Sequence, residues 1–308
     1  MNDVIETVSD YISTISEFNR EAIHRRDISV SNISFYRGQS DYEWGFAPRL
    51  YREQLLDKES VLISELLRIA PHEFKQMGYF DILVKMQHYG LSTRLLDTTL
   101  NPLVALFFAC YGDAQKSKDG SVALFPSLPV FNPDSSPISL IMKYVFEHSG
   151  HNLDIQKFMQ DVVTSKELFS PFSASHDTIK DILHTLVKVP FYAVLPTLNN
   201  QRILNQDGAF FVFGMKIKEI IKSKNPGTYN KEYYIFDSIE YDNMVEKLWP
   251  RAKLLRIPHS RKGSILEELE YIGIAKNRMF PELEYQSEFI TNLIKKQKEQ
   301  WLSRYSKH

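Results

Sequence analysis

The sequence predicts an α+β fold, in which helices pack on a mixed or antiparallel sheet. In the first half of the chain, apolar residues recur at three- and four-residue spacing, which is typical of amphipathic helices. From residue 187 onwards, short runs rich in Phe, Tyr, Val and Ile are typical of strands. Because helices precede strands instead of alternating with them, an α+β arrangement is favoured over regular βαβ units.

The first elements are an amphipathic helix and a short strand. Within residues 1–26, apolar side chains recur at helical spacing: Val4, Ile5, Val8, Tyr11, Ile12, Ile15 and Phe18. After a region rich in Ser and Asn, residues 33–36 form a strand-like run that ends at Arg37, Gly38 and Gln39. We expect the glycine to permit a sharp change of direction there, so that the arginine lies at a strand end.

Two further helices are predicted before residue 91. Residues 58–70 show helical apolar spacing, and Pro71 ends the pattern because proline cannot continue a helix. Residues 79–90 place apolar side chains on one helical face, and Gly90 follows as a candidate for a left-handed C-terminal cap.

A buried helix should follow Asn101. Asparagine is a good N-cap and Pro102 suits the first helical position. Residues 103–112 are apolar nearly all round, which predicts a central helix of the fold. Cys110 is then expected to be a core residue.

The second half of the chain is predicted to supply most of the strands. Residues 120–126 resemble a strand after a turn, whereas 127–186 are weakly patterned and are interpreted as an insertion. The later strand-like runs are residues 187–196, 208–214, 232–241 and 253–258. Ser264 and Glu267 form a possible capping box that opens a helix, and the tail 285–301 is amphipathic and basic.

Composition excludes several classes of protein. Hydrophobic and charged residues make up 43% and 24% of the chain, which fits neither a disordered chain nor a coiled coil. The net charge of -1 gives no global support for nucleic-acid binding. The single cysteine forms no intramolecular disulfide and no structural zinc set, so we expect a cytoplasmic protein. The acidic N-terminus does not resemble a signal peptide, and no apolar run is long enough to span a membrane.

Arg37 and Gln39 are the first candidate site residues. An arginine at a strand end offers five donors in a planar fork that suits phosphate or carboxylate. The alternative is structural, with Arg37 capping a neighbouring helix or pairing with an acid at the edge of the core.

Residues 86–102 are the densest in polar chemistry, and we expect them to form a loop between two helices. They include Gln87, His88, Tyr89, Ser92, Thr93, Arg94 and Asp97. His88 can act as a proton shuttle, contact a phosphate or orient a sugar hydroxyl, or it can be a structural residue at a helix C-terminus. Arg94 and Asp97 can bind a ligand or pair with each other, and Asp97 can also cap the next helix.

A second polar run, residues 199–208, precedes an aromatic strand. Gln206 and Arg202 can contact a base or an amide, or Asp207 and Gly208 can simply form a turn. The sequence contains no Walker loop, no G-x-G-x-x-G, no G-x-S-x-G, no H-E-x-x-H and no paired-cysteine metal site. The common hydrolase and kinase signatures are therefore absent, and no metal ligand is predicted.

Four motifs in order resemble those of the FRG-domain family, named for a Phe/Tyr-Arg-Gly motif. They are FYRGQSDYEWGFAPRLYRE, MQHYGLSTRLLDTTLNPLVALFFA, QRILNQDGAFFVFG and GIAKNRMFPELE. Ser92 and Thr98 depart from the family pattern, which has proline and tryptophan there. The resemblance implies one domain over residues 30–290 with the insertion near 127–186, an N-terminal helix at 1–29 and a helical tail at 291–308. It also implies a bacterial protein linked with phage defence or stress response.

A more distant likeness is to the three-part NAD site of ADP-ribosyltransferases, with NAD as the possible cofactor. The likeness places Arg37 on a phosphate or ribose and a serine or threonine, such as Thr93, in support of the nicotinamide pocket. The third position carries Gln206, where those enzymes use glutamate. Since an amide cannot act as a carboxylate base, transfer would need Asp207 or a remote acid.

The sequence leads to one functional hypothesis with two alternatives. The hypothesis is that a single cleft binds a small anionic, nucleotide-like ligand, without a membrane partner and with an undetermined oligomeric state. Its ligand-binding residues are Arg37, Gln39, Thr93, Arg94 and Asp97, and its candidate catalytic residues are His88, Tyr89 and Gln206. The first alternative is an NAD-dependent ADP-ribosyltransferase or NAD glycohydrolase, in which His88 and Tyr89 hold the nicotinamide ribose. The second is a nuclease or phosphodiesterase built on His88 and Asp97.

Overall fold

The computed structural model describes most of the chain outside the predicted insertion. The described residues are 3–24, 33–112, 117–147, 152–154, 191–214, 216–223, 231–237, 249, 251–283, 285–287, 290, 291, 294, 295 and 298.

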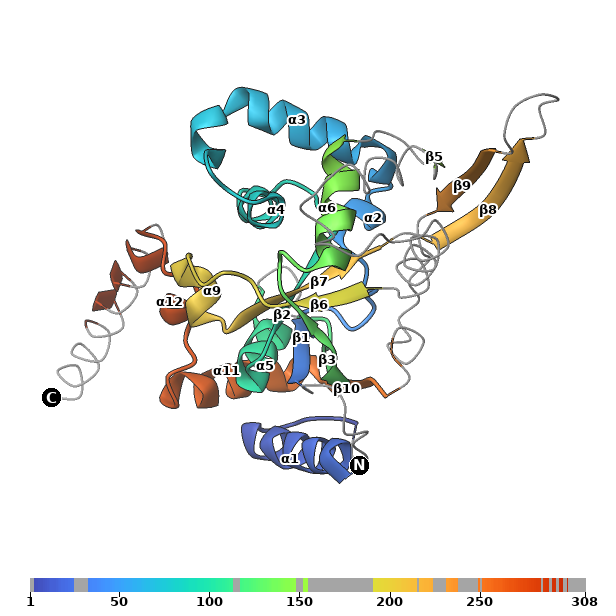
Figure 1. Ribbon diagram of the computed structural model, residues 1–308. Helices are drawn as coiled ribbons and strands as arrows, with labels where there is room; N and C mark the ends of the chain where they lie inside the picture. Colours follow the sequence, from blue (N-terminus) through green and yellow to red (C-terminus); the bar gives the residue numbers. More distant parts are fainter. Residues whose placement is uncertain are drawn as a thin grey trace, which may run out of the picture.

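A seven-stranded sheet forms the centre of the molecule (Figure 1). Its strands, in spatial order, are β10 (Lys253–Ile257), β3 (Gly120–Leu128), β1 (Ile33–Gln39), β2 (Leu95–Thr99), β7 (Gly208–Phe213), β6 (Phe191–Val194) and β4 (Val130–Phe131). Neighbouring strands are antiparallel except for the edge pair of β4 and β6, which is parallel. The predicted α+β class with a mixed or antiparallel sheet is confirmed.

Two groups of helices pack on this sheet. One group is α1 (Val8–His24), α5 (Pro102–Cys110) and α11 (Lys262–Tyr271), which share an apolar cluster with β1, β3 and β10. The other is α3 (Glu59–Ile69), α4 (Tyr79–His88) and α6 (Ser136–Glu147), which share a cluster with β2, β6 and β7. A third cluster contains strand residues that alternate with those of the first two clusters, for example in β1, β2, β3 and β7. It joins them to α2 (Arg49–Arg52) and the 3₁₀ turn η1 (Leu56–Lys58). The chain between β1 and β2 contains α3 and α4 and thus supplies two helices of the second group (Figure 1).

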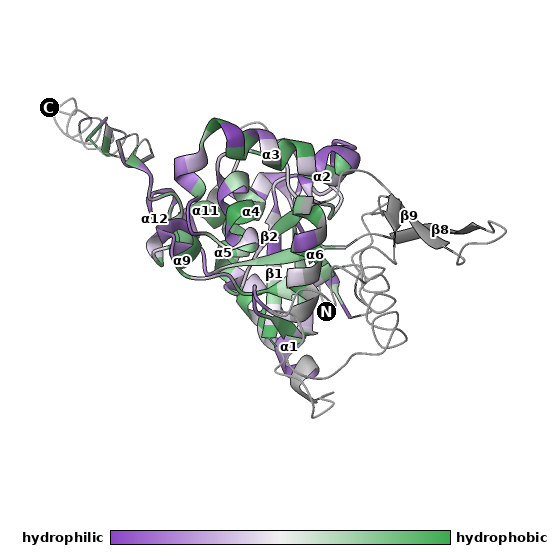
Figure 2. Cartoon of the chain, turned by 45° about the horizontal axis from the view of Figure 1, so that its top comes forward, coloured by the Kyte–Doolittle hydropathy of each residue, from purple (hydrophilic) through white to green (hydrophobic). Residues whose placement is uncertain are grey.

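The predicted helices of the first half are confirmed with small shifts in their ends. Pro71 follows α3 directly and opens the short turn η2 (Pro71–Phe74). Gly90 follows α4 with a φ of 90°, as expected for a left-handed cap. The Asn101 side chain accepts a hydrogen bond from the Leu103 amide at the start of α5, and Cys110 is buried at its end. Figure 2 shows the hydrophobic character of α5 and the central strands, whereas the outer helix α3 carries both hydrophobic and hydrophilic residues.

Gly38 has a different role from the predicted one. It lies inside β1, and the strand continues through it without the expected change of direction. A Cβ on Gly38 would lie 1.8 Å from the Ala105 carbonyl oxygen and 2.8 Å from the Ala109 amide nitrogen. The glycine is therefore required by the close contact between β1 and α5.

Two other predictions are wrong. Residues 95–99 are not loop but form β2, a central strand that pairs with β7 over five residues. The capping box at Ser264 does not open α11, because the helix begins two residues earlier at Lys262 and the Ser264 hydroxyl donates to the Arg261 carbonyl.

The second half supplies the expected strands and a smaller sheet. The predicted strands near 120, 191, 208 and 253 are β3, β6, β7 and β10. A three-stranded sheet contains β5 (Asn152–Asp154), β9 (Lys231–Asp237) and β8 (Lys216–Ser223). Most of the predicted insertion, and much of the predicted tail helix, lie outside the described residues.

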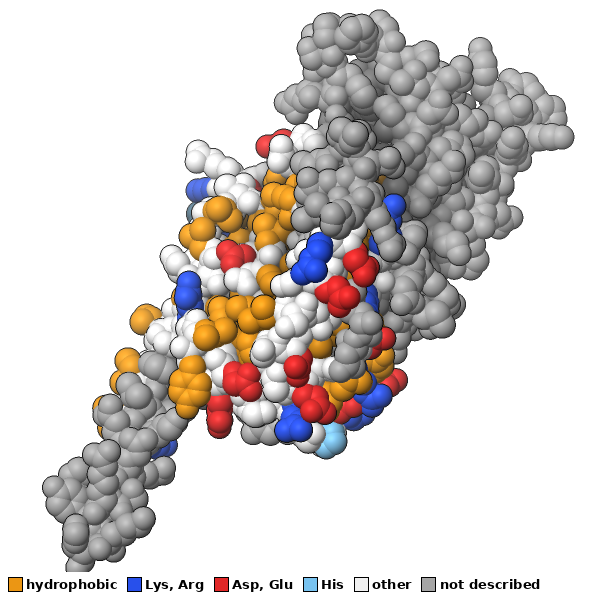
Figure 3. All heavy atoms as spheres, turned by 90° about the horizontal axis from the view of Figure 1, so that it is seen from below, with side chains coloured by type: hydrophobic (Ala, Val, Ile, Leu, Met, Phe, Trp, Pro, Cys, Tyr) orange, Lys and Arg blue, Asp and Glu red, His pale blue; other side chains and the backbone are white. Residues whose placement is uncertain are grey.

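The surface bears both signs of charge. On the face seen in Figure 3, acidic and basic side chains lie among hydrophobic ones and form no broad basic field. Among the described helices, none has both the length and the apolar character needed to cross a membrane.

Candidate functional site

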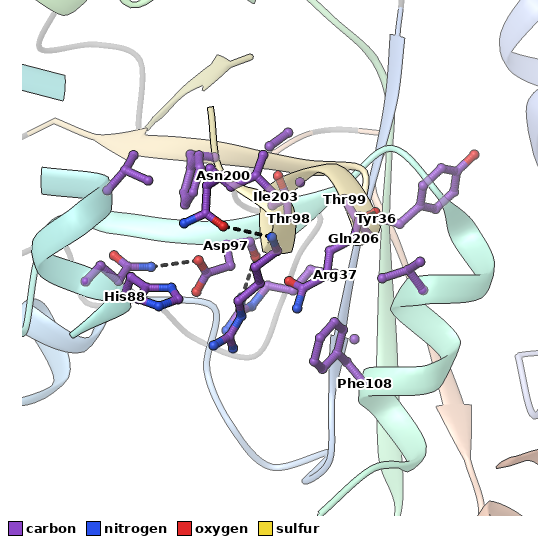
Figure 4. Close-up of a pocket in the computed structure, with 18 residues that line it drawn as sticks. Tyr36, Arg37, His88, Asp97, Thr98, Thr99, Phe108, Asn200, Ile203 and Gln206 are labelled. Carbon is purple, nitrogen blue, oxygen red and sulfur yellow. Dashed lines mark hydrogen bonds between the residues drawn. The ribbon is translucent and has the colours of Figure 1, made fainter. Parts of the chain in front are cut away.

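A pocket of about 300 Å³ lies between α4, α5 and the short helix α9 (Gln201–Asn205), over strands β1, β2 and β7. This volume falls at the lower end of the range for small-molecule sites. Its polar lining residues are Arg37, Gln87, His88, Asp97, Thr98, Thr99, Asn200, Arg202 and Gln206, and several of them are shown in Figure 4. Its apolar wall includes Val84, Val104, Phe108, Ile203 and Phe210.

The pocket opens where β1 and β2 separate. The two strands share the register pair Tyr36–Thr99, whereas β1 shares six register pairs with β3. If the antiparallel ladder continued, residue 38 would face Asp97. Instead, the Asp97 carbonyl accepts a hydrogen bond from Nη1 of Arg37, so the arginine side chain satisfies a strand carbonyl beside the opening.

Arg37 retains donors that can contact a ligand. Its Nε donates to Oε1 of Gln39 at 3.2 Å, and Gln39 in turn donates to the Trp44 carbonyl at 3.0 Å. Among the described residues, Nη2 of Arg37 has no hydrogen-bond partner, and the side chain points into the pocket (Figure 4). Burial lowers the pKa of Arg37 to about 10, while the Asp97 charge opposes that shift. Arg37 is therefore a cation at neutral pH.

Asp97 is the exposed residue of an otherwise buried strand. Its neighbours in β2 are buried on both sides, whereas its own carboxylate is open to the pocket. Oδ1 accepts a hydrogen bond from Nε2 of Gln87 at 2.8 Å. The Gln87 amide oxygen accepts from the Thr93 hydroxyl, which itself accepts from the Leu95 amide at 3.2 Å. Thr93 thus lies behind the pocket and supports a residue that lines it.

At the other end of the pocket, Arg202 and His88 lie beside a carboxylate. Glu282, which follows the short helix α12 (Lys276–Met279), places Oε1 3.4 Å from Nη1 of Arg202 and 3.8 Å from Nε2 of His88. The Arg202 guanidinium also lies over the Phe280 ring at 5.0 Å. The charge of Arg202 is thereby partly compensated within the protein, unlike the charge of Arg37.

Gln206 joins the pocket to the C-terminal segment. Its amide nitrogen donates to the Met279 carbonyl at 2.8 Å, and its backbone carbonyl accepts from the Thr99 hydroxyl at 2.6 Å. Asp207, the acid proposed to replace a missing glutamate, does not line the pocket, and its carboxylate accepts from the Asn101 side chain.

The structure brings together four of the eight predicted site residues, namely Arg37, His88, Asp97 and Gln206. Gln39 and Thr93 are buried just behind them. Tyr89 is 66% exposed and lies outside the lining, with its ring against His88. Arg94 is buried elsewhere, where it pairs with Glu59 instead of Asp97.

The predictions did not include several lining residues. Gln87 was recognised only as part of a polar stretch, although its place beside His88 on one helix was a usable signal. Phe108 lies in the apolar run of α5, where nothing in the sequence distinguishes a pocket residue from a core residue. Thr98, which departs from the family pattern, also lines the pocket. Among the residues that the structure describes, no group of three His, Cys, Asp or Glu could hold a metal ion.

Comparison with known proteins identifies one region of the chain. No curated protein and no solved structure matches the chain. The likeness to ADP-ribosyltransferases is not shown by these comparisons and stays a prediction. Residues 32–118, which include β1, α4, β2 and α5, match the family model of the FRG domain. The chain therefore contains an FRG domain, and this domain supplies Arg37, His88 and Asp97 to the pocket.

Proposed function

We propose that the FRG domain binds a small anionic, nucleotide-like ligand in the pocket between α4, α5 and α9. The observation that supports this best is Arg37, a half-buried cation whose Nη2 has no partner in the described part of the chain. Planar guanidinium donors suit phosphate and carboxylate oxygens. The net charge of -1 gives no global attraction for an anion, and the face seen in Figure 3 shows no broad basic field, so placed cations such as Arg37 would provide most of the attraction.

The remaining lining fits the rest of a nucleotide. Phe108 and Phe210 offer apolar ring surfaces, and the Asn200 amide nitrogen offers a donor at the polar edge, while its oxygen accepts from the Arg202 amide. Aromatic rings stack on bases, and amide side chains hydrogen-bond their edges. The resemblance to the FRG family extends the proposal to a bacterial role in phage defence or stress response.

Binding assays on a matched pair of arginine variants test the proposal. Isothermal titration calorimetry would compare AMP, ADP-ribose, NAD and inorganic phosphate on the wild type, Arg37→Gln and Arg68→Gln. Arg68 is an exposed arginine of α3 that pairs with Glu65, so it controls for the loss of one positive charge. A charge-assisted hydrogen bond contributes about 1.5 to 3 kcal/mol, so Arg37→Gln should weaken binding about 10- to 100-fold. Unchanged affinity in a folded Arg37→Gln protein would contradict the proposal.

A second candidate function is cleavage of NAD, as a transferase or a glycohydrolase. The observation that favours it is the Asp97 carboxylate, which lines the pocket although the glutamate of the resembled enzymes is missing. A carboxylate there can act as a general base or stabilise positive charge that develops on a ribose. Incubation with labelled NAD should release nicotinamide from the wild type and far less from Asp97→Asn. An absence of release from the folded wild type would exclude this function and leave the binding proposal intact.

A further inference from the structure

The Asp97 carboxylate occupies an unusual position for a charged group. It is the one exposed side chain in β2, with β7 paired to the strand on one side of it and the opening left by β1 on the other. Oδ1 is used by Gln87, whereas Oδ2 has no hydrogen-bond partner among the described residues. No ion pair of the described residues includes Asp97. The free oxygen of this carboxylate is therefore available to a ligand in the pocket.

A chain of three hydrogen bonds fixes how this carboxylate is presented. The Thr93 hydroxyl accepts from the Leu95 amide, so its proton is directed to the Gln87 amide oxygen. That bond determines which end of the Gln87 amide faces Thr93, and the amide nitrogen is then left to donate to Asp97. A rotated amide would oppose the carboxylate with an oxygen. Gln87 and Thr93 are therefore positioning residues for the Asp97 carboxylate.

The backbone of Asp97 connects its carboxylate to Arg37, the residue proposed to contact the anion. Nη1 of Arg37 donates to the backbone carbonyl of Asp97, and both side chains line the one pocket. A ligand whose anionic group binds Nη2 of Arg37 can therefore place a second group, a hydrogen-bond donor, against Oδ2 of Asp97. A cationic donor at Asp97 would be repelled by the nearby guanidinium, whereas a neutral hydroxyl would not. Paired hydroxyls of ribose are common partners for such a carboxylate in nucleotide sites.

We infer that Asp97, oriented by Gln87 and Thr93, binds the ribose hydroxyls of the ligand. The site thereby selects ribonucleotides over inorganic phosphate and over dideoxynucleotides. This inference rests on the proposed function, in which Arg37 binds the phosphate. Arg37 then supplies affinity for any small phosphate, and Asp97 supplies discrimination among them.

The test measures a preference instead of an affinity alone. Calorimetric titration of AMP, 2′,3′-dideoxy-AMP and inorganic phosphate would be carried out on the full chain. The wild type should prefer AMP over the dideoxy compound by about tenfold or more, because the site rejects a ligand that leaves its carboxylate without a donor. Asp97→Asn should reduce this preference to near unity and leave phosphate binding equal or tighter, since one negative charge near the anion is removed.

Two threonine variants separate positioning from stability. Thr93→Val removes the hydroxyl that orients Gln87 and should lower the preference for AMP, with little change in phosphate affinity. Thr14→Val, at a buried threonine of α1 whose hydroxyl donates to the Asp10 carbonyl, is the matched control and should leave the preference unchanged. A merely structural role for Thr93 would weaken all three probes together, and that result would overturn its assignment.

The outcomes distinguish the two proposals. If the wild type binds AMP and dideoxy-AMP equally, or if Asp97→Asn keeps the full preference, the inference about ribose fails and the proposed function stands. If the folded wild type binds none of the three probes, the proposed function fails and the inference fails with it.

Discussion

Arg37 and Arg94 belong to the same FRG segment, yet the structure uses their charges in opposite ways. Arg94 is 2% exposed, and its Nε and Nη2 donate to the Glu59 carboxylate while Nη1 donates to the Phe213 carbonyl. Arg37 is bound by neutral partners, and no carboxylate of the described residues forms an ion pair with it. The interior pair therefore holds α3 against β2 and β7, whereas the pocket arginine keeps its charge for a ligand. The difference shows that the role of an arginine in such a motif depends on its partners and not on its residue type alone.

Breaking the interior pair should give the largest effect on stability. Glu59→Gln leaves the Arg94 charge buried without a counter-charge, which typically costs about 3 to 5 kcal/mol. Urea unfolding followed by circular dichroism would measure the free energy of unfolding. The double variant Glu59→Leu with Arg94→Met should recover most of the loss, because it removes both charges. A loss below about 1 kcal/mol for Glu59→Gln would mean that the pair of Arg94 and Glu59 does not stabilise the fold more than a surface ion pair does.

The pocket side of the comparison depends on the contact between β1 and α5. Gly38→Ala places a Cβ against the Ala105 and Ala109 backbone, so strand and helix must separate. We expect a loss of about 3 kcal/mol, at the upper end for overpacked sites. Gly263→Ala in α11 is the matched control, since its Cβ meets nothing within 4 Å and alanine should stabilise the helix by about 0.5 to 1 kcal/mol. Equal effects of the two substitutions on thermal unfolding would show that the close contact is unimportant.

Local signals in the sequence predicted the helices well and one strand poorly. The N-cap at Asn101, the stop at Pro71 and the cap at Gly90 each depend on a few adjacent residues, and each is confirmed. Residues 95–99 are predicted to lie in a loop between two helices, whereas the structure forms β2 there. Its stability comes from pairing with β7, more than 100 residues later, and no local pattern reports such a partner.

The candidate site shows the same division. The polar groups at element ends predict that eight residues converge on one cleft, and the structure places four of them, Arg37, His88, Asp97 and Gln206, in one pocket. The sequence did not show that Arg94 has its partner 35 residues earlier, in α3, because charge pairing across the core is set by tertiary packing. The same reason hides the support of Asp97 by Gln87 and Thr93. Residue types thus identified the candidates, and only their contacts separated ligand groups from structural ones.

The surface carboxylate of Asp119, which pairs with Arg256, adds a third case to the comparison of Arg94 with Arg37. Burial alone would raise the pKa of Asp119, but hydrogen bonds from the backbone and ring of His259 and from Arg256 outweigh it and lower the pKa to about 2. Since the folded pKa lies below the ordinary value of 3.8, the stabilisation is present above about pH 4 and is lost as the pH falls towards 2. Solvent screening reduces the contribution to about 1 kcal/mol.

Asp119→Asn should therefore destabilise the protein by about that amount at pH 7, and the difference from the wild type should shrink as the pH approaches 2. Thermal unfolding between pH 7 and pH 2, with the exposed Asp134→Asn as control, measures this; a constant difference over that range would show that the carboxylate charge is not the cause.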